Sequence, residues 1–84
     1  MSSLQDSLEM ILDQMIEMQE KKTLKVACEV HPNLTPEDIR NPQDFNDLYL
    51  DPVFNYEDGI LTGYLSVRTA FRNEVKKLSD TESD

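Results

Sequence analysis

The segment HPNLTPEDIRNPQDFNDLYLDP, residues 31–52, contains all four prolines of the 84-residue chain and five of its carboxylates. Three of these prolines follow a residue type that favours the N-cap of a helix, in the pairs Thr35-Pro36, Asn41-Pro42 and Asp51-Pro52. Each proline disfavours helix in the residue before it, so the segment reads as successive short helical turns. Its large apolar residues are too many for a solvated linker: Leu34, Ile39, Phe45, Leu48 and Leu50. We therefore predict an ordered elbow.

The first turn of this elbow has the fullest helix-start signal. Thr35 is followed three residues later by Asp38, which occupies the second position of a capping box. Leu34 and Ile39 stand at the two positions of a hydrophobic staple. These features predict that a short helix begins at Pro36.

The residues before the elbow have helical spacing. Leu4, Leu8, Ile11, Leu12 and Met15 recur at steps of three and four, which is typical of an amphipathic helix. After residue 22 a second helical stripe begins nearly opposite the first, formed by Leu24, Ala27, Cys28 and His31. Residues 23–30 also alternate as a strand would, but we prefer helix because no second strand is available to pair with them.

The residues after the elbow predict a second long helix, from about Val53 to Leu78. Apolar residues keep helical spacing through the whole run: Val53, Tyr56, Ile60, Tyr64, Val67, Phe71, Val75 and Leu78. The pair Asp58-Gly59 leaves a start after Gly59 open, because Asp-Gly often forms a turn. We assign residues 1–78 to one helical domain and residues 79–84 to a flexible acidic tail.

These elements predict an all-α fold in which two long antiparallel helices are joined by an elbow of short helical turns. Eighty-four residues form one small domain, so self-association is an open alternative, with two hairpins pairing into a four-helix bundle. Arg68 and Arg72 share one face of the second helix, and we expect them to meet the acidic elbow.

The formal net charge is −9, and residues 31–58 carry −6 of it. Seven carboxylates form a candidate acidic patch: Glu37, Asp38, Asp44, Asp47, Asp51, Glu57 and Asp58. A surface of this kind repels nucleic-acid phosphates and attracts basic proteins, so we expect no direct nucleic-acid binding. Solubility and helix capping explain the same acids without any partner.

Two sets of residues are candidates for helix contacts. The first is a stripe with the 4-3-4-3 spacing of a short coiled coil, which we interpret as a partner-binding surface or as a surface buried within the fold: Leu4, Leu8, Ile11, Met15 and Met18. The second is a ridge of small residues, which we interpret as a helix-packing surface, internal or between two copies, in preference to a ligand-binding notch: Gly59, Gly63, Ser66 and Ala70.

The chain offers little for catalysis or metal binding. Cys28 and His31 are three residues apart, but structural zinc normally requires four ligands, drawn mostly from Cys and His. No third group stands out that would orient a Cys–His nucleophile, and "VFNYEDGILTGYL" fails the ligand spacing of an EF-hand loop. We expect no metal, no cofactor and no enzymatic activity.

The remaining expectations concern location and role. A lone cysteine favours a reducing compartment, and the sequence shows neither a signal peptide nor a membrane span, so we expect a cytoplasmic protein. The leading hypothesis is a non-enzymatic interaction module, such as an adaptor, a chaperone-like partner or a small regulator, that contacts another protein or a second copy through the Leu4–Met18 stripe. The alternative is an acidic decoy or inhibitor that binds a basic protein surface.

Overall fold

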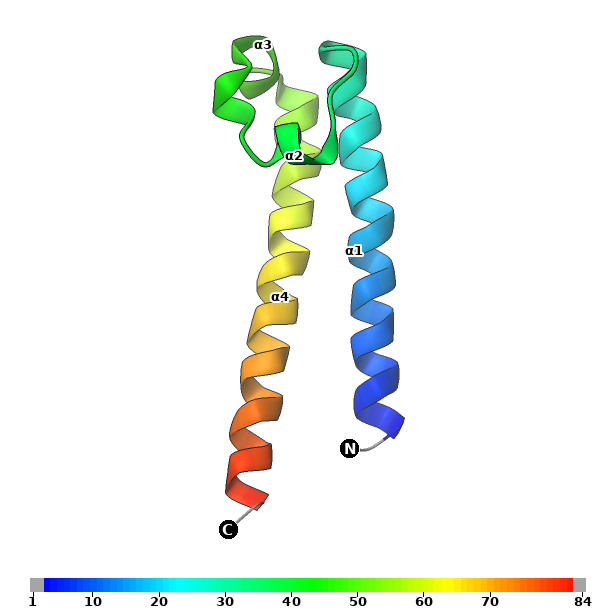
Figure 1. The fold of residues 1–84 in the computed structure, drawn as a ribbon, viewed down its shortest axis with the longest axis vertical. Helices are drawn as coiled ribbons and strands as arrows, with labels where there is room; N and C mark the ends of the chain where they lie inside the picture. Colours follow the sequence, from blue (N-terminus) through cyan, green and yellow to red (C-terminus); the bar gives the residue numbers. More distant parts are fainter. Residues whose placement is uncertain (1–2, 83–84) are drawn as a thin grey trace.

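Two long helices lie side by side and antiparallel, with the short elements gathered at one end and both chain ends at the other (Figure 1). This computed structural model describes residues 3–82, and side-chain burial up to residue 79. Its elements are α1 (Ser3–Val30), α2 (Pro36–Ile39), the 3₁₀ helix η1 (Pro42–Asp44), α3 (Asn46–Tyr49) and α4 (Pro52–Glu82). The predicted all-α helical hairpin is confirmed.

The open questions about helix boundaries have clear answers. Residues 23–30 are helical, because α1 runs to Val30 without a break. α4 begins at Pro52, so Asp58-Gly59 lies inside the helix and makes no turn. The predicted end of this helix at Leu78 is too early, since α4 continues to Glu82. Of the predicted tail, residues 83 and 84 lie outside the described residues.

Helix capping shapes the elbow in two of the three predicted places. The backbone N–H of Thr35 donates to Asp38 Oδ2 at 2.9 Å, and the N–H of Asp38 donates to Thr35 Oγ1 at 3.3 Å, which completes the capping box. Asp51 Oδ2 accepts from the N–H of Phe54 at 2.8 Å. Asn41 makes no side-chain cap, so that part of the prediction is wrong, and the turn after it is a 3₁₀ helix.

The main core lies where the elbow meets the ends of the two long helices. Its buried members come from four elements and the loop after α1: Ala27, Leu34, Ile39, Leu48 and Phe54. Phe45 is half-buried against them, whereas Leu50 is 65% exposed, contrary to the expectation that it is tucked in. The proline-rich segment is therefore an ordered part of the core.

A second set of contacts, the α1–α4 seam, runs along the two long helices. On α1 it consists of Gln5, Glu9, Leu12, Ile16, Gln19 and Thr23, and on α4 of Phe54, Glu57, Leu61, Tyr64, Arg68, Phe71 and Val75, all buried or half-buried. On both helices these residues repeat at steps of three and four, the spacing of antiparallel helices that cross at a small angle. Several apolar residues of the predicted α4 stripe do not face α1. In these places the residue that follows the apolar one lies in the seam instead. Val53, Tyr56 and Val67 are 57%, 68% and 55% exposed.

Candidate protein-interaction surface

The predicted stripe on α1 is exposed along its whole length. Its five side chains are between 39% and 72% exposed: Leu4, Leu8, Ile11, Met15 and Met18. Each of them immediately precedes a seam residue, so it is rotated by about 100° away from α4. Burial of this stripe within the chain, one of the two readings of the sequence, does not occur.

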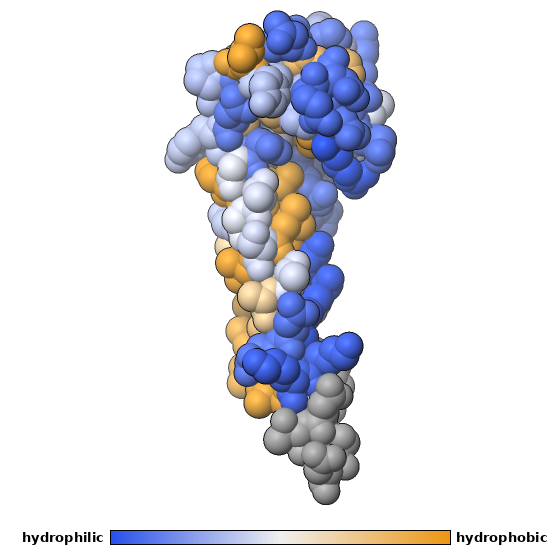
Figure 2. Space-filling view, turned by 90° about the vertical axis from the view of Figure 1, so that its left-hand side faces the viewer, coloured by the Kyte–Doolittle hydropathy of each residue, from blue (hydrophilic) through white to orange (hydrophobic). Residues whose placement is uncertain are grey.

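Apolar side chains of α4, exposed except for the half-buried Ile60, lie on the same side of the hairpin. Val53, Tyr56, Ile60 and Val67 also precede seam residues, and in an antiparallel pair this rotation carries both helices' residues to one side. We call the combined surface the apolar face: Leu4, Leu8, Ile11, Met15 and Met18 of α1 with Val53, Tyr56, Ile60, Val67 and Leu78 of α4. Figure 2 shows hydrophobic surface along one edge of the lower half of the molecule and hydrophilic surface along the opposite edge.

The opposite side of the hairpin is charged. Arg72 Nε binds Glu9 Oε1 at 2.6 Å, and Arg68 Nη1 binds Asp13 Oδ1 at 3.0 Å. The two arginines were expected to reach the acidic elbow, but their partners are on α1. Arg68 and Arg72 lie several turns from the elbow along α4, and antiparallel pairing places the first half of α1 beside them.

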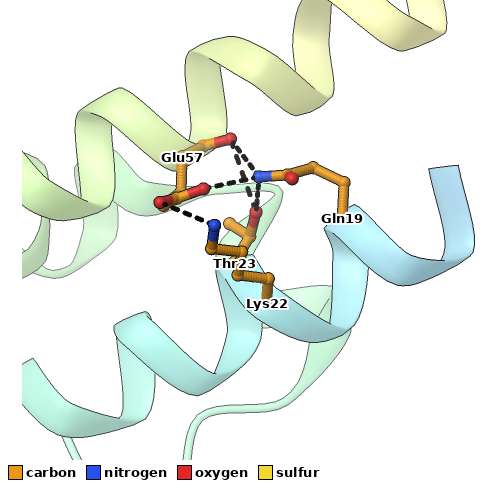
Figure 3. Close-up of polar contacts among 4 residues, drawn as sticks. All are labelled: Gln19, Lys22, Thr23 and Glu57. Atoms are coloured by element: carbon orange, nitrogen blue, oxygen red, sulfur yellow. Dashed lines mark hydrogen bonds and ion pairs between the residues drawn. The ribbon is translucent and has the colours of Figure 1, made fainter. Parts of the chain in front are cut away.

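A layer of polar side chains interrupts the α1–α4 seam close to the elbow (Figure 3). Gln19 Nε2 donates to Glu57 Oε1 at 2.9 Å, to the Glu57 carbonyl oxygen at 3.0 Å and to Thr23 Oγ1 at 3.3 Å. Lys22 Nζ approaches Glu57 Oε2 at 3.6 Å from the solvent side. Gln19, Thr23 and Glu57 are all less than 9% exposed.

This polar layer was missed by the sequence reasoning, which placed Glu57 in the acidic patch. A signal did exist, because Gln19 and Thr23 continue the step of three and four from Leu12 and Ile16. Because Gln19 and Thr23 are polar, a search for apolar spacing does not include them. No buried side-chain nitrogen or oxygen in the described part of the chain lacks a hydrogen-bond partner.

Most of the predicted acidic patch is engaged within the chain. Asp38 and Asp51 cap helices, Glu37 pairs with Arg40 at 2.7 Å, and Glu57 belongs to the polar layer. Asp47 Oδ2 lies 3.1 Å from His31 Nδ1, and this hydrogen bond lowers the pKa of Asp47. Within the described residues, only Asp44 and Asp58 of the seven make no side-chain hydrogen bond or ion pair.

Asp58 lies at a groove of about 440 Å³ on the charged side of the hairpin. α1, α2, η1 and α4 all contribute to this groove, and its apolar lining is Leu24, Pro36, Ile39, Pro42, Leu61 and Leu65. Partial burial of the carboxyl group raises the pKa of Asp58, because the charged form loses solvation. Asp58 is thus the one member of the patch whose pKa is raised, and loss of solvation is the cause. Lys21 and Arg40 also line the groove, but within the described residues neither forms an ion pair with Asp58.

The raised pKa of Asp58 predicts a pH-dependent effect on stability. A carboxyl group with a higher pKa in the folded state stabilises the fold below its unfolded-state pKa, and this contribution is lost as pH rises through the folded-state pKa. We expect Asp58→Asn to raise the free energy of unfolding at pH 7, by less than about 1 kcal/mol because the group is only half-buried. The gain should shrink below about pH 4.

Thermal unfolding of Asp58→Asn and Asp44→Asn, each compared with the native protein at pH 7 and below about pH 4, tests this expectation. Asp44→Asn removes the same charge from an exposed position and so reports the effect of net charge alone. Equal gains for the two variants at pH 7 would contradict the role given to burial of Asp58.

Cys28 and His31 are each occupied by other neighbours. Cys28 Sγ donates to the carbonyl oxygen of Leu34 at 3.5 Å. The His31 ring packs on Phe45 with the ring centres 5.1 Å apart and bonds Asp47 on its Nδ1 side. Within the part of the chain that the structure describes, no three His, Cys, Asp or Glu side chains group as a metal site would require.

The small-residue ridge lies on the exposed surface of α4. A Cβ atom placed on Gly59 or Gly63 meets nothing within 4 Å, and Ser66 and Ala70 are exposed. The internal form of the helix-packing prediction is therefore wrong: α1 lies on the other side of α4. Packing of this ridge against a second copy stays a prediction.

Two further findings bear on function. None of the helices in residues 3–82 combines the length and the apolar character needed to cross a bilayer. Comparison with protein-family models, with curated proteins and with solved structures found no match to this chain.

Proposed function

We propose that this chain is a small acidic, non-enzymatic protein-interaction module that contacts a protein partner through its apolar face. The class includes adaptors, chaperone-like partners and small regulators. The apolar face carries the proposal: it joins exposed Leu, Ile, Met, Val and Tyr side chains of two helices in one surface, and contiguous apolar surfaces on small soluble domains mark interaction sites. A cytoplasmic location remains part of the proposal.

The shape of this face favours a helical partner. It is formed by two parallel ridges of side chains at helical spacing, and such ridges accept a helix, or a pair of helices, in the groove between them. Two methionines lie in the α1 half, and their flexible side chains adapt to varied apolar surfaces: Met15 and Met18.

The runner-up, an acidic decoy, has less support from the geometry. Its carboxylates would need to be available to a basic partner, but five of the seven already cap helices or pair within the chain. If the capping carboxylates Asp38 and Asp51 moved to an external partner, they would leave N–H groups unsatisfied at two helix starts. The two functions also differ in salt dependence, because contacts between exposed charges weaken strongly as salt rises.

Site-specific photo-crosslinking distinguishes the two functions. A photoreactive phenylalanine analogue would replace Met15 on the apolar face, Asp44 on the elbow or Thr69 on the polar side of α4, in separate full-length chains. We expect crosslinked protein from the Met15 position in source lysate, at low and high salt alike, with the yield reduced at least about tenfold by a second change, Ile11→Asp.

Thr69 serves as the matched control, since it is exposed on the same hairpin away from the apolar face. Crosslinks from the Asp44 position alone, lost at high salt, would show that the acidic patch is the binding surface. The absence of crosslinks at all three positions would also contradict the proposal.

A further inference from the structure

The hairpin exposes more surface than a folded monomer of its size should. Its accessible surface is 6117 Å², whereas about 5,100 Å² is typical of a folded monomer of this mass, 9.7 kDa. Its radius of gyration is 16.3 Å, against about 12 Å for a compact domain of this length. The surplus of roughly 1,000 Å² is close to the roughly 800 Å² that each partner contributes to a stable protein–protein interface.

This surplus has a structural cause. Two paired helices form a single layer, and a layer with an apolar face is normally covered by a second layer. The elbow covers part of the charged side, where α2 and η1 line the groove with α1 and α4. Within the described residues, no element of the chain covers the apolar face, and nine of its ten side chains remain exposed, while Ile60 is half-buried.

We propose that a second copy of this chain covers the apolar face, so that two hairpins form a four-helix bundle. This inference rests on the proposed function and names the partner. A face two helices wide and nearly as long as the hairpin is matched by a layer with the same dimensions and spacing, and the chain itself supplies one. The contact would be isologous, with the same surface used on both copies.

The distribution of charge permits this pairing despite the net charge of −9. Glu74 precedes the seam residue Val75 and so lies on the side of the apolar face, where it pairs with Lys77 at 3.8 Å. On α1, Glu9 and Asp13 bind arginines on the opposite side of the hairpin, and Glu17 and Glu20 line the groove on that same side. When two apolar faces meet, these carboxylates are kept apart by about the 10 Å diameter of a helix on each copy. The distance between these carboxylates on the two copies therefore exceeds the Debye length of about 8 Å in physiological salt, and their repulsion across the interface is largely screened.

The experiment measures the mass of the full-length protein and of two matched variants in solution. Light scattering should give twice 9.7 kDa for the native protein. Ile11→Asp places a charge in the centre of the α1 half of the face, and it should give the monomer mass, with the dissociation constant raised at least about a hundredfold. Thr69→Asp adds the same charge away from the face and should stay dimeric.

A second measurement covers the case in which Ile11→Asp fails to fold. The melting temperature of the native protein should rise with protein concentration, because the dimer dissociates on unfolding. A native mass of 9.7 kDa with a concentration-independent melting temperature would overturn the inference. A folded Ile11→Asp variant that keeps the dimer mass would overturn it as well, because the copies would then pair through another surface.

The two proposals fail separately. A monomeric native protein that still crosslinks from the Met15 position to a different protein removes the second copy but keeps the interaction module. A dimer that survives Ile11→Asp, with no crosslinks from Met15, removes both the apolar face as an interface and the proposed function.

Discussion

Phe54→Ala is expected to lower the free energy of unfolding by about 3–5 kcal/mol. Phe54 is fully buried in the core where the elbow meets α1 and α4, and it is the largest fully buried side chain in the described residues. Truncation removes its apolar contacts and leaves a cavity that rigid helix ends cannot fill. Since a domain of this size has a total stability of roughly 4–13 kcal/mol, this loss removes between about a quarter and all of it.

Urea unfolding at a fixed protein concentration measures this effect, with Leu50→Ala as the control. Leu50 is also a large apolar residue of the elbow region, but it is 65% exposed, so its truncation should change stability by no more than about 0.5 kcal/mol. Similar losses for the two variants would show that the core is not centred on Phe54.

Gln19→Leu is expected to cost about 1–3 kcal/mol, although it places an apolar residue in the seam between two helices. The Gln19 amide donates to both the carboxylate and the carbonyl oxygen of Glu57, and Glu57 is 7% exposed. Without this amide, Lys22 at 3.6 Å is the remaining charged contact of a buried carboxylate. Removing one partner of a buried polar pair leaves the other without compensation for its lost solvation.

The double variant Gln19→Leu/Glu57→Leu should recover most of this loss. Two leucines at facing seam positions pack as in an ordinary coiled coil, and replacing a whole buried polar pair is often neutral or stabilising. Chemical unfolding of both single variants and the double variant gives the coupling energy of the pair. A double variant no more stable than Gln19→Leu would mean that Glu57 is solvated and that the layer contributes nothing through its hydrogen bonds.

The polar layer also bears on how the helices are paired. A slip of α4 by one helical turn along α1 would move Glu57 away from Gln19 and bury both groups unsatisfied. Buried polar contacts of this kind are known to fix register in coiled coils. We infer that Gln19 and Glu57 hold the hairpin in one register.

The sequence predicted the local structure well, because the forces that decide it act within a few residues. The capping box at Thr35 and Asp38 depends on atoms three residues apart, and so does the cap that Asp51 gives to the start of α4. Helical spacing before and after the elbow required only that apolar residues recur every three or four positions. The all-α hairpin followed from these signals.

The orientation of each helix about its own axis was predicted less well. On α1 the strongest apolar spacing, through Leu8 and Ile11, belongs to the exposed face. On α4 the apolar run is divided between exposed residues such as Tyr56 and Val67 and the seam residues Tyr64, Phe71 and Val75. Periodicity shows that a helix has an apolar side but does not say which neighbour that side meets. Polar residues such as Gln19 and Glu57 fill the inward positions instead, and their inclusion depends on hydrogen bonds between residues 38 apart.

The sequence by itself determined that this chain forms two long helices and an ordered, capped elbow, because capping and helical periodicity are local properties of the chain. Only the tertiary structure decided which stripe of each helix is buried, since that choice depends on contacts between residues far apart in the sequence. Core packing at Phe54 and the polar pair of Gln19 with Glu57 set this rotation. As a consequence, the apolar face is left on the surface of the hairpin, where a partner has access to it.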